Sequence, residues 1–329
     1  MKIAWRNGVS IRYKDTRIIL DPQSRCLTHE VAFITHAHVD HSRAFRINYV
    51  SKFSSEETMK LVSIEGVTIR KWQPLVKNKK TVVEDVEVIP HSSGHVLGSY
   101  EFEVTTPDGT VLFTGDLNTK HERTVDPAEP VECDILIIDS TFGSPSFVFP
   151  PDDLIIKEMT EWAKKILSDG RIPVFQADPL GNAQEIIRVF NEYTNIPVIS
   201  HWKVSKINKI YEFYGHRMKY VDVRTEDAYD LISHRNAVIV APKRLGSFYS
   251  PGFVSAFVSG WALKFRRKSF PLSDHADFPN LIEFISRCNP KLVLTYHGGK
   301  FNHILAKYIE RKLNIKSYPI NLIPTDFSS

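Results

Sequence analysis

The stretch THAHVDHS at residues 35–42 places three histidines and one aspartate within six positions. The chain has only 13 histidines among 329 residues, so this spacing seldom arises by accident. Histidine nitrogen and aspartate oxygen are the ligands that zinc takes in catalytic sites. Four such groups on one short loop cannot all face one ion without strain, but they can divide between two ions. We therefore predict half of a two-metal site, in which His36 and His38 hold one ion. Asp40 and His41 hold the other.

Composition indicates an ordinary globular protein and limits its location. Hydrophobic residues make up 42% and charged residues 24% of the chain, and no run of 18 apolar residues or signal-peptide core is present. Cys26, Cys133 and Cys288 are scattered singly, which fits a reducing cytosol. We expect a soluble cytoplasmic protein without membrane contact. The net charge of +4 permits a nucleic-acid partner but does not demand one.

Short strand-like segments separated by turns fill the first 140 residues. One of them, YEFEVTTPDGTVLFTGD, alternates apolar and polar residues around a Pro-Asp-Gly turn and predicts a hairpin. Several segments end on a residue capable of chemistry: Asp21, His36, Asp116 and Asp139. Strand ends that converge on one rim are how an α/β or layered sheet builds a site.

Strands alternate with amphipathic helices in the middle of the chain. Residues 151–170, PDDLIIKEMTEWAKKILSDG, begin with proline and acidic residues and end at glycine, as a capped helix does. Strand and helix patterns then repeat, which indicates a parallel sheet. The end of the chain returns to the first pattern. We therefore expect one α/β domain made of residues 1–144 and 269–329, with a second α/β domain, residues 145–268, inserted into it.

Each predicted ion still needs ligands, and three residues at strand ends are candidates. His95 lies in the glycine-bounded loop HSSGHVLGS, Asp116 follows VLFTG and His297 follows LVLTY. Asp116 suits a bridging position, because one carboxylate can give an oxygen to each metal. Two metals roughly 3.5 to 4 Å apart clamp the attacking and leaving oxygens of a displacement at phosphorus.

The order of these residues resembles the metallo-β-lactamase fold: Asp21, the run His36-x-His38-x-Asp40-His41, His95, Asp116 and His297. The surroundings resemble its β-CASP branch of nucleases, which has three added motifs called A, B and C. Asp139 in IIDSTFG matches motif A, His275 in LSDHADF matches motif B and His297 in LTYHGG matches motif C. The resemblance covers nearly the whole chain. It implies an αββα metallo-β-lactamase sandwich with an inserted α/β β-CASP domain.

The resemblance also implies roles for these residues in a two-zinc phosphodiesterase, with Mn²⁺ or Mg²⁺ as possible replacements for zinc. It divides the ligands into His36, His38 and His95 for one ion, Asp40, His41 and His297 for the other, and Asp116 as the bridge. His275 would be the general acid that protonates the leaving oxygen, oriented by Asp139. Asp21 would hold a ligand histidine in the right tautomer. A histidine pKa near neutrality suits such an acid.

Hydroxyl and basic residues near the motifs are candidate contacts for substrate phosphates: Ser99, Ser140, Thr141, Arg266, Arg267 and Lys268. Lys243 and Arg244 in APKRLG are weighed in the same way. The hydroxyls would form a terminal-phosphate pocket typical of an exonuclease, and the basic residues would neutralise the backbone. Their alternative roles, as strand-end turns and solvated charges, stay open.

Sequence features point to both DNA and RNA as substrates. DSTFGSPSFVFPP, SGW at 259–261 and SDHADF at 273–278 resemble the Artemis-type repair nucleases and the ligase-associated DNA exonucleases. His297 at motif C resembles the RNA-processing branch, although the ligase-associated group carries histidine there too. The chain starts with lactamase-type strands, whereas archaeal relatives of the polyadenylation endonuclease start with RNA-binding domains. We therefore expect a DNA exonuclease of repair type, with an RNA-processing endo- or exoribonuclease as the alternative.

Two further classes stay open beside a nuclease. A small-molecule metallohydrolase, such as a lactonase or thioesterase, uses the same fold, but it needs neither the long insertion nor motif B. A scaffold that only binds nucleic acid would have lost ligands, and every expected ligand is present in this chain.

Overall fold

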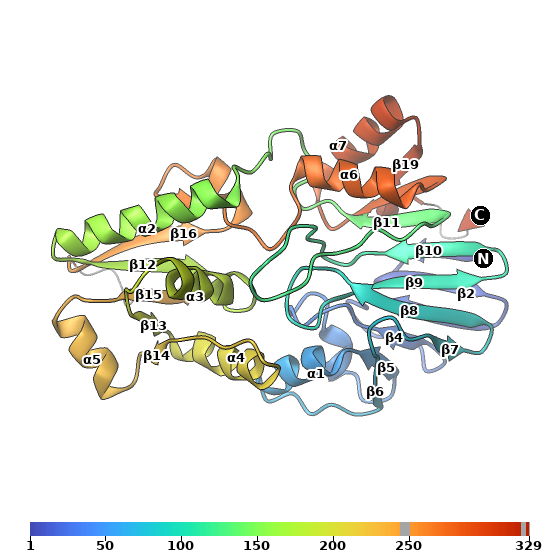
Figure 1. The fold of residues 1–329 in the computed structure, drawn as a ribbon. Helices are drawn as coiled ribbons and strands as arrows, with labels where there is room; N and C mark the ends of the chain where they lie inside the picture. The colour runs from blue at the N-terminus through green and yellow to red at the C-terminus, as the bar shows by residue number, and fades with distance from the viewer. Residues whose placement is uncertain (244–250, 324–326, 329) are drawn as a thin grey trace. The chain divides into compact units, whose positions relative to one another are not determined.

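The computed structural model describes residues 1–243, 251–323 and 327–328, so Arg244 lies outside the described residues. The chain divides into two compact units. Unit 1 comprises Met1–His121, Val125–Val148 and His275–Ser329; unit 2 comprises Glu122–Thr124 and Phe149–Asp274. Both units combine strands with helices (Figure 1), which confirms the α/β class. In the part of the chain that the structure describes, no helix is long and apolar enough to cross a membrane.

The described residues of unit 1 form two seven-stranded sheets. In the first sheet, antiparallel pairs at one end give way to parallel strands from β3 onward. Its strands in spatial order are β20 (Phe327–Ser328), β1 (Lys2–Trp5), β2 (Val9–Tyr13), β3 (Thr16–Leu20), β4 (Val31–Phe33), β5 (Ser51–Ser54) and β6 (Trp72–Pro74).

The second sheet repeats this mixture, with a parallel half and an antiparallel half. The predicted hairpin is present as its antiparallel pair β9–β10, with Phe102 opposite Phe113. The strands in spatial order are β19 (Lys316–Pro319), β18 (Leu292–Tyr296), β11 (Ile135–Asp139), β10 (Gly109–Phe113), β9 (Tyr100–Thr106), β8 (Val86–Ser92) and β7 (Thr81–Val83).

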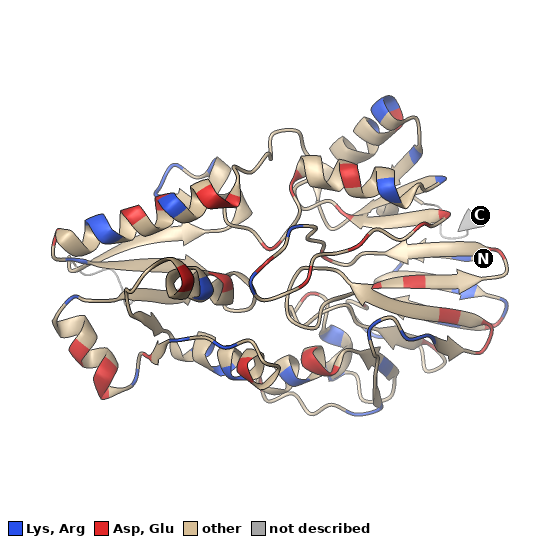
Figure 2. Cartoon of the chain, in the orientation of Figure 1, with Lys and Arg blue, Asp and Glu red and all other residues tan. Residues whose placement is uncertain are grey.

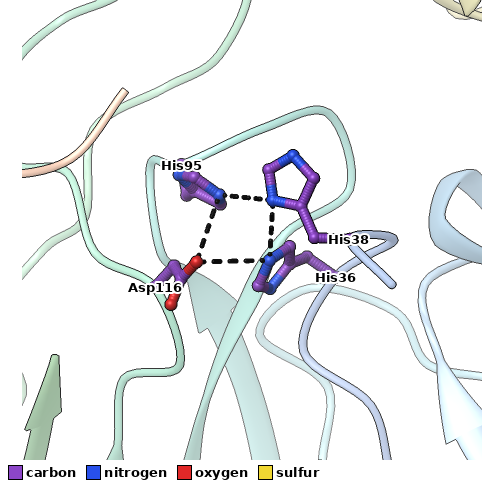
Figure 3. A group of neighbouring side chains, drawn as sticks. All are labelled: His36, His38, His95 and Asp116. Atoms are coloured by element: carbon purple, nitrogen blue, oxygen red, sulfur yellow. Dashed lines mark hydrogen bonds and ion pairs between the residues drawn. The ribbon is translucent and has the colours of Figure 1, made fainter. Parts of the chain in front are cut away.

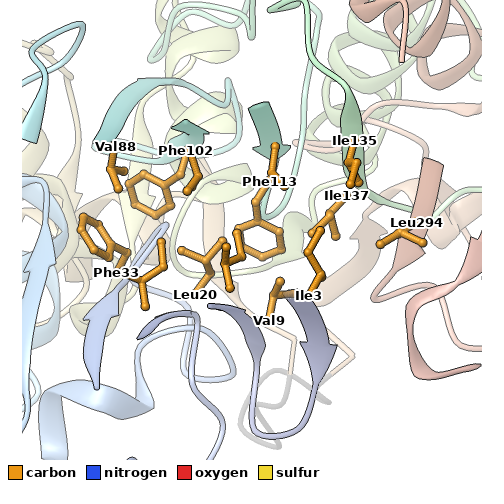
Figure 4. Packing of buried hydrophobic residues seen from close by; sticks show 14 of the residues in the cluster. Ile3, Val9, Leu20, Phe33, Val88, Phe102, Phe113, Ile135, Ile137 and Leu294 are labelled. Carbon is orange, nitrogen blue, oxygen red and sulfur yellow. The ribbon is translucent and has the colours of Figure 1, made fainter. Parts of the chain in front are cut away.

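One hydrophobic core joins the two sheets of unit 1 (Figure 4). Val9 and Ile11 of the first sheet are two residues apart, so both point to the same side of β2. Phe102 and Phe113 of the second sheet belong to the same buried cluster. Each such side chain contributes about 1.5–3 kcal/mol when it leaves water, so the core fixes the two sheets face to face.

Helices cover the outer faces of both sheets. Ile19 and Ile34 on the far side of the first sheet pack in a cluster with Val62 of α1 (Glu56–Ser63). Leu136 of the second sheet packs in another cluster with Leu281 of α6 (Phe278–Cys288). The remaining helical elements of unit 1 are η1 (Arg43–Arg46), α7 (Lys300–Tyr308), the π-helical η4 (Ile309–Leu313) and η5 (Ile320–Leu322).

Unit 2 contains a six-stranded sheet within the described residues, and its strand pairs are parallel, as predicted. The predicted helix at 151–170 is α2, which starts after Pro151 and stops before Gly170, whose φ is +67°. The sheet order is β14 (Val221–Asp222), β13 (Val198–Ser200), β15 (Val238–Pro242), β12 (Ile172–Ala177), β16 (Phe253–Val258) and β17 (Ser269–Phe270). The helices are α2 (Asp152–Ser168), α3 (Asn182–Tyr193), α4 (Trp202–Phe213), α5 (Glu226–Ser233) and η3 (Gly260–Lys264).

Candidate metal centre

The ends of strands from both sheets of unit 1 bring the histidines and aspartates of the sequence motifs together. Asp21 follows β3, His36 to His41 follow β4, His95 follows β8, Asp116 follows β10, Asp139 ends β11 and His297 follows β18. The loop after β4 is closed by the backbone N–H groups of His41 and Ser42, which both donate to the carbonyl of His38 at 3.0 and 2.9 Å. The turn brings His41 back over the strand end that carries His36.

Two glycines allow backbone approaches that the site requires. Gly115 has a φ of +56°, and a Cβ there would lie 2.7 Å from the Thr35 side chain, so only glycine lets the end of β10 lie against the end of β4. A Cβ on Gly298 would lie 2.1 Å from the carbonyl oxygen of Ser140. The neighbouring His297 has a φ of +65°. A positive φ is uncommon for residues other than glycine and is often found at functional sites.

Four side chains converge in the first ligand group (Figure 3). Nδ1 of His38 lies 3.1 Å from Nε2 of His36 and 3.0 Å from Nε2 of His95. Oδ2 of Asp116 lies 3.5 Å from Nε2 of both His36 and His95. Ligand atoms at about 2.0–2.1 Å from a tetrahedral zinc lie roughly 3.3 Å from one another. The four atoms therefore have the spacing of one tetrahedral ion.

The second group shares Asp116 with the first. Nε2 of His41 lies 3.3 Å from Oδ1 of Asp116, so the two oxygens of this carboxylate face different histidines. Oδ2 of Asp40 lies 3.8 Å from Nε2 of His41 and 3.5 Å from Nε2 of His297. Nε2 of His41 and Oδ1 of Asp116 are buried and make no hydrogen bond among the described residues. A ring nitrogen and a carboxylate oxygen that are buried, lack a hydrogen bond and face each other fit a shared cation.

Asp21 fixes the tautomers of two histidines, one of them through Thr35. Oδ2 of Asp21 accepts the Nδ1–H of His41 at 2.7 Å and the hydroxyl of Thr35 at 2.6 Å. Because Thr35 donates its one proton to Asp21, its oxygen accepts the Nδ1–H of His36 at 2.9 Å. In the neutral form of each ring, Nε2 of His36 and of His41 then carries the lone pair that faces the site. Thr35 was missed in the sequence interpretation, although it is the first residue of THAHVDHS.

Thr35→Val should weaken metal binding or activity by about 10- to 100-fold, because His36 and Asp21 lose a buried partner while the side-chain shape stays the same. Competition titration with a zinc chelator and a cleavage assay measure the two effects. Thr35→Ser keeps the hydroxyl and should stay near the parent. Parental metal affinity in the valine variant would contradict the proposed tautomer control.

The charges around Asp116 favour a cation beside it. Burial lowers the pKa of His36 well below its usual value, so this ring is neutral and able to act as a ligand. Burial alone would also lower the pKa of His41, but the carboxylates of Asp116 and Asp21 raise it to about 10. Burial would raise the pKa of Asp116, yet His41 and His297 hold it well below its usual range. Asp116 is therefore charged, and a proton on His41 balances it.

His275 and Asp139 form a second pair beside the first ligand group. Oδ2 of Asp139 accepts from Nδ1 of His275 at 2.9 Å. Nε2 of His275 then points toward Oδ2 of Asp116, at 3.8 Å. The other oxygen of Asp139 accepts from the backbone N–H and hydroxyl of Thr141 at 2.8 and 2.7 Å, which fixes the carboxylate. The geometry suits an imidazole that exchanges a proton at Nε2.

Three hydroxyls predicted as phosphate contacts already have partners inside unit 1. Ser99 Oγ accepts from the backbone N–H groups of His95 and Val96 and shapes the His95 loop. The hydroxyl of Ser140 lies 2.6 Å from the carbonyl of Tyr296 and is buried. Thr141 holds Asp139, as described above. These contacts favour the turn and positioning roles, and phosphate contact by these residues stays a prediction.

The basic candidates lie in unit 2. Arg266, Arg267 and Lys268 are exposed. The Arg267 guanidinium lies 3.4 Å from the ring centre of Phe257, and the Lys268 ammonium lies 4.4 Å from that of Phe270. Lys243 pairs with Asp178. Exposed cations of this kind are accessible to phosphates, and phosphate contact by these residues stays a prediction.

Curated proteins similar to this chain are named for DNA ligation and for RNA cleavage. No family model matches the chain. The chain is 28% identical to a protein named "Probable DNA ligase" from Opitutus terrae, over 81% of this chain and 26% of that protein. It is 26% identical to an RNase J-like protein from Methanocaldococcus jannaschii, over 50% of this chain and 44% of that protein. The chain thus spans less than half the length of either relative.

A solved structure extends the likeness to the fold as a whole. The crystal structure of a protein of unknown function from Enterococcus faecalis superimposes with a TM-score of 0.70 at 15% identity, covering 99% of this chain and 98% of that one. That likeness concerns the fold alone. The curated relatives are β-CASP members of the metallo-β-lactamase family. This chain is similar to these relatives, and its sequence motifs resemble the same family.

Proposed function

We propose that this protein is a metal-dependent nuclease that hydrolyses phosphodiester bonds of nucleic acid at a two-metal site. The observation that carries the proposal is the shared carboxylate of Asp116. One oxygen faces the group of His36, His38 and His95, and the other faces His41. A buried carboxylate divided between two histidine clusters fits a pair of cations and has no other evident use in the fold.

The ligand chemistry supports zinc first. His36, His38, His95 and Asp116 would hold one ion, and Asp40, His41, His297 and Asp116 the other. Five imidazoles and two carboxylates form a set typical of zinc, although Mn²⁺ or Mg²⁺ remain candidates. Two such ions, when bound, would polarise a phosphate and supply an activated water near neutral pH.

The protein's own residues would supply orientation and protons. Asp21 and Thr35 engage Nδ1 of His41 and of His36, so Nε2 is the nitrogen of each ring that would bind an ion. Asp139 accepts from Nδ1 of His275, so a protonated His275 can give its Nε2 proton to a leaving oxygen. Thr141 holds Asp139 in place. These roles agree with those implied by the family motifs.

The finer features of the fold are part of the same proposal. The face-to-face sheets of unit 1, covered by helices on their outer sides, support an αββα metallo-β-lactamase sandwich. Unit 2, which comprises Phe149–Asp274 with Glu122–Thr124, supports an inserted β-CASP domain. The predicted limits, 145–268 inside a domain of residues 1–144 and 269–329, stay a prediction. A cytoplasmic location remains our expectation from the scattered, unpaired cysteines.

Relatives support DNA and RNA substrates to a similar degree. The match that spans 81% of this chain is to a protein named for DNA ligation, which favours a DNA exonuclease of repair type. The matches to RNase J-like and endoribonuclease proteins favour RNA processing. We place DNA first and RNA second.

Cleavage of end-labelled single-stranded DNA, duplex DNA and RNA tests the proposal directly. We expect about two metal ions per chain and faster product formation from one nucleic acid than from the others. Stepwise ladders from one end would indicate exonuclease action, and internal products would indicate endonuclease action. Absence of bound metal at neutral pH, or no cleavage of any of the three substrates, would overturn the proposal.

A further inference from the structure

Helix α4 of unit 2 carries a row of lysines on its exposed side. Lys203, Lys206 and Lys209 recur at every third residue, and all three are exposed. The opposite side of the helix is buried through Val204, Ser205, Ile207, Asn208 and Tyr211. Residues three apart are neighbours on a helix, so the three ammonium groups form one stripe about 9 Å long.

The lysines of the stripe have no ion-pair partner in the described part of the chain, although Glu212 stands on the same helix. None of the three lysines forms an ion pair there, although many other lysines of the protein do. Like charges at this helical spacing repel one another and disfavour the helix. A row of unpaired cations is therefore costly to the isolated protein, and a bound polyanion would remove the repulsion.

The other helices of unit 2 differ from α4 in charge. On α2, Lys157, Lys164 and Lys165 alternate with the acidic residues Asp152, Asp153, Glu158 and Glu161. Figure 2 shows this helix with both blue and red segments along its length. On α5 the charged residues are acidic: Glu226, Asp227 and Asp230. The excess of positive charge thus belongs to α4 and is not a property of helices in this unit.

Trp202 lies at the start of the stripe. It is partly exposed, and the ammonium groups of Lys203 and Lys206 lie 5.4 and 5.2 Å from its ring centre. The ring centre of His201 lies 5.4 Å from that of Trp202, so the two rings pack against each other. A flat aromatic ring beside a row of cations is the combination by which proteins hold single strands, with the ring stacking on a base and the cations on phosphates.

We propose that α4 is a binding surface for single-stranded nucleic acid, in which the three lysines contact successive phosphates and Trp202 stacks on a base. Three ammonium groups on one stripe can neutralise about three phosphates, one for each lysine. None of these four residues belongs to the candidate metal centre. The inference rests on the proposed function, because it assigns the protein a nucleic-acid substrate, and it adds where that strand is held.

Fluorescence anisotropy tests the surface with a labelled phosphorothioate single strand of about 20 nucleotides, which keeps the backbone charge and resists cleavage. The triple variant Lys203→Gln, Lys206→Gln, Lys209→Gln should bind roughly tenfold more weakly and lower the salt dependence by about two counterions. Trp202→Leu should weaken binding with little change in salt dependence, since stacking carries no charge. The matched control is Lys157→Gln, Lys164→Gln, Lys165→Gln on α2, which removes the same charge.

The two triple variants decide the inference by their difference. If both bind the strand equally well, or if the α4 triple keeps the parental salt slope, α4 is not the binding surface. Hydrolysis of bis(p-nitrophenyl) phosphate, which is too small to reach a helix-long stripe, should stay at the parental rate in all variants. If the parent cuts no nucleic acid, the proposed function fails, but the difference between the triples still decides the surface.

Discussion

Asp116→Asn should remove nuclease activity by more than about 100-fold and lower the bound metal from two ions toward one or none per chain. This expected loss of activity exceeds the 10- to 100-fold effect of a residue that only orients a ligand, because Asp116 lies in both ligand groups. An asparagine keeps the size and one carbonyl oxygen, but its amide cannot give a negatively charged oxygen to each cluster. Metal analysis by mass spectrometry and cleavage rates measure the two effects.

The control for Asp116→Asn is Asp126→Asn, which removes the same charge from an exposed carboxylate of unit 1 that pairs with Lys77. It should keep parental metal content and activity. The apo proteins of both variants should unfold at similar temperatures, which excludes gross misfolding. Two bound ions in Asp116→Asn, at parental affinity, would show that Asp116 is not the bridge.

The positions of the candidate ligands could be foreseen because strand ends are visible in sequence. Apolar runs of three or four residues precede Asp21, His36 and Asp116 with at most two residues between, and the structure brings these three together at one rim of unit 1. The interpretation of THAHVDHS as a divided loop also agrees with the grouping in space: His36 and His38 lie with His95, and Asp40 and His41 with His297. Whether each binds metal stays a prediction.

The hydrogen bonds that orient the ligands could not be foreseen. Thr35 reads as the last residue of a strand, and its role depends on Asp21 at the end of the neighbouring strand, fourteen residues earlier. Ser99 was predicted to meet a phosphate, but its hydroxyl is used by the loop that contains it. Such partners are set by how closely two backbones approach, which the sequence pattern does not encode.

Element boundaries show the same limit. Apolar residues recur at helical spacing in ILAKYIERKL, from residue 304 onward, whereas α7 starts at Lys300, directly after the glycine pair, and is followed by the π-helical η4. Gly299 adopts a φ of +56° and lets the chain turn from β18 into the helix at once. Apolar periodicity marks which face is buried, but the first turn is fixed by local backbone geometry.

His275→Ala should slow cleavage of nucleic acid by roughly 10²- to 10⁴-fold while leaving bound metal unchanged. The reason is that Nε2 of His275 is the group placed to protonate the leaving oxygen, with Nδ1 held by Asp139 at 2.9 Å. The exposed His303 on α7 provides the control His303→Ala, which should cut at the parental rate. Asp139→Asn should have a similar but smaller effect, because the ring remains but is less well oriented.

The leaving group separates this role from metal binding. A nitrophenolate is stable as an anion and needs no proton, so His275→Ala should hydrolyse bis(p-nitrophenyl) phosphate within about tenfold of the parent. The opposite result has a definite meaning, because His275 also lies within ligand distance of Asp116 and Asp139. If His275→Ala loses both substrates equally and loses metal as well, His275 is a ligand. If His275→Ala slows the cleavage of nucleic acid but not of bis(p-nitrophenyl) phosphate, His275 is the general acid. Its ring is then the proton donor of the site, oriented by the carboxylate of Asp139 at the end of β11.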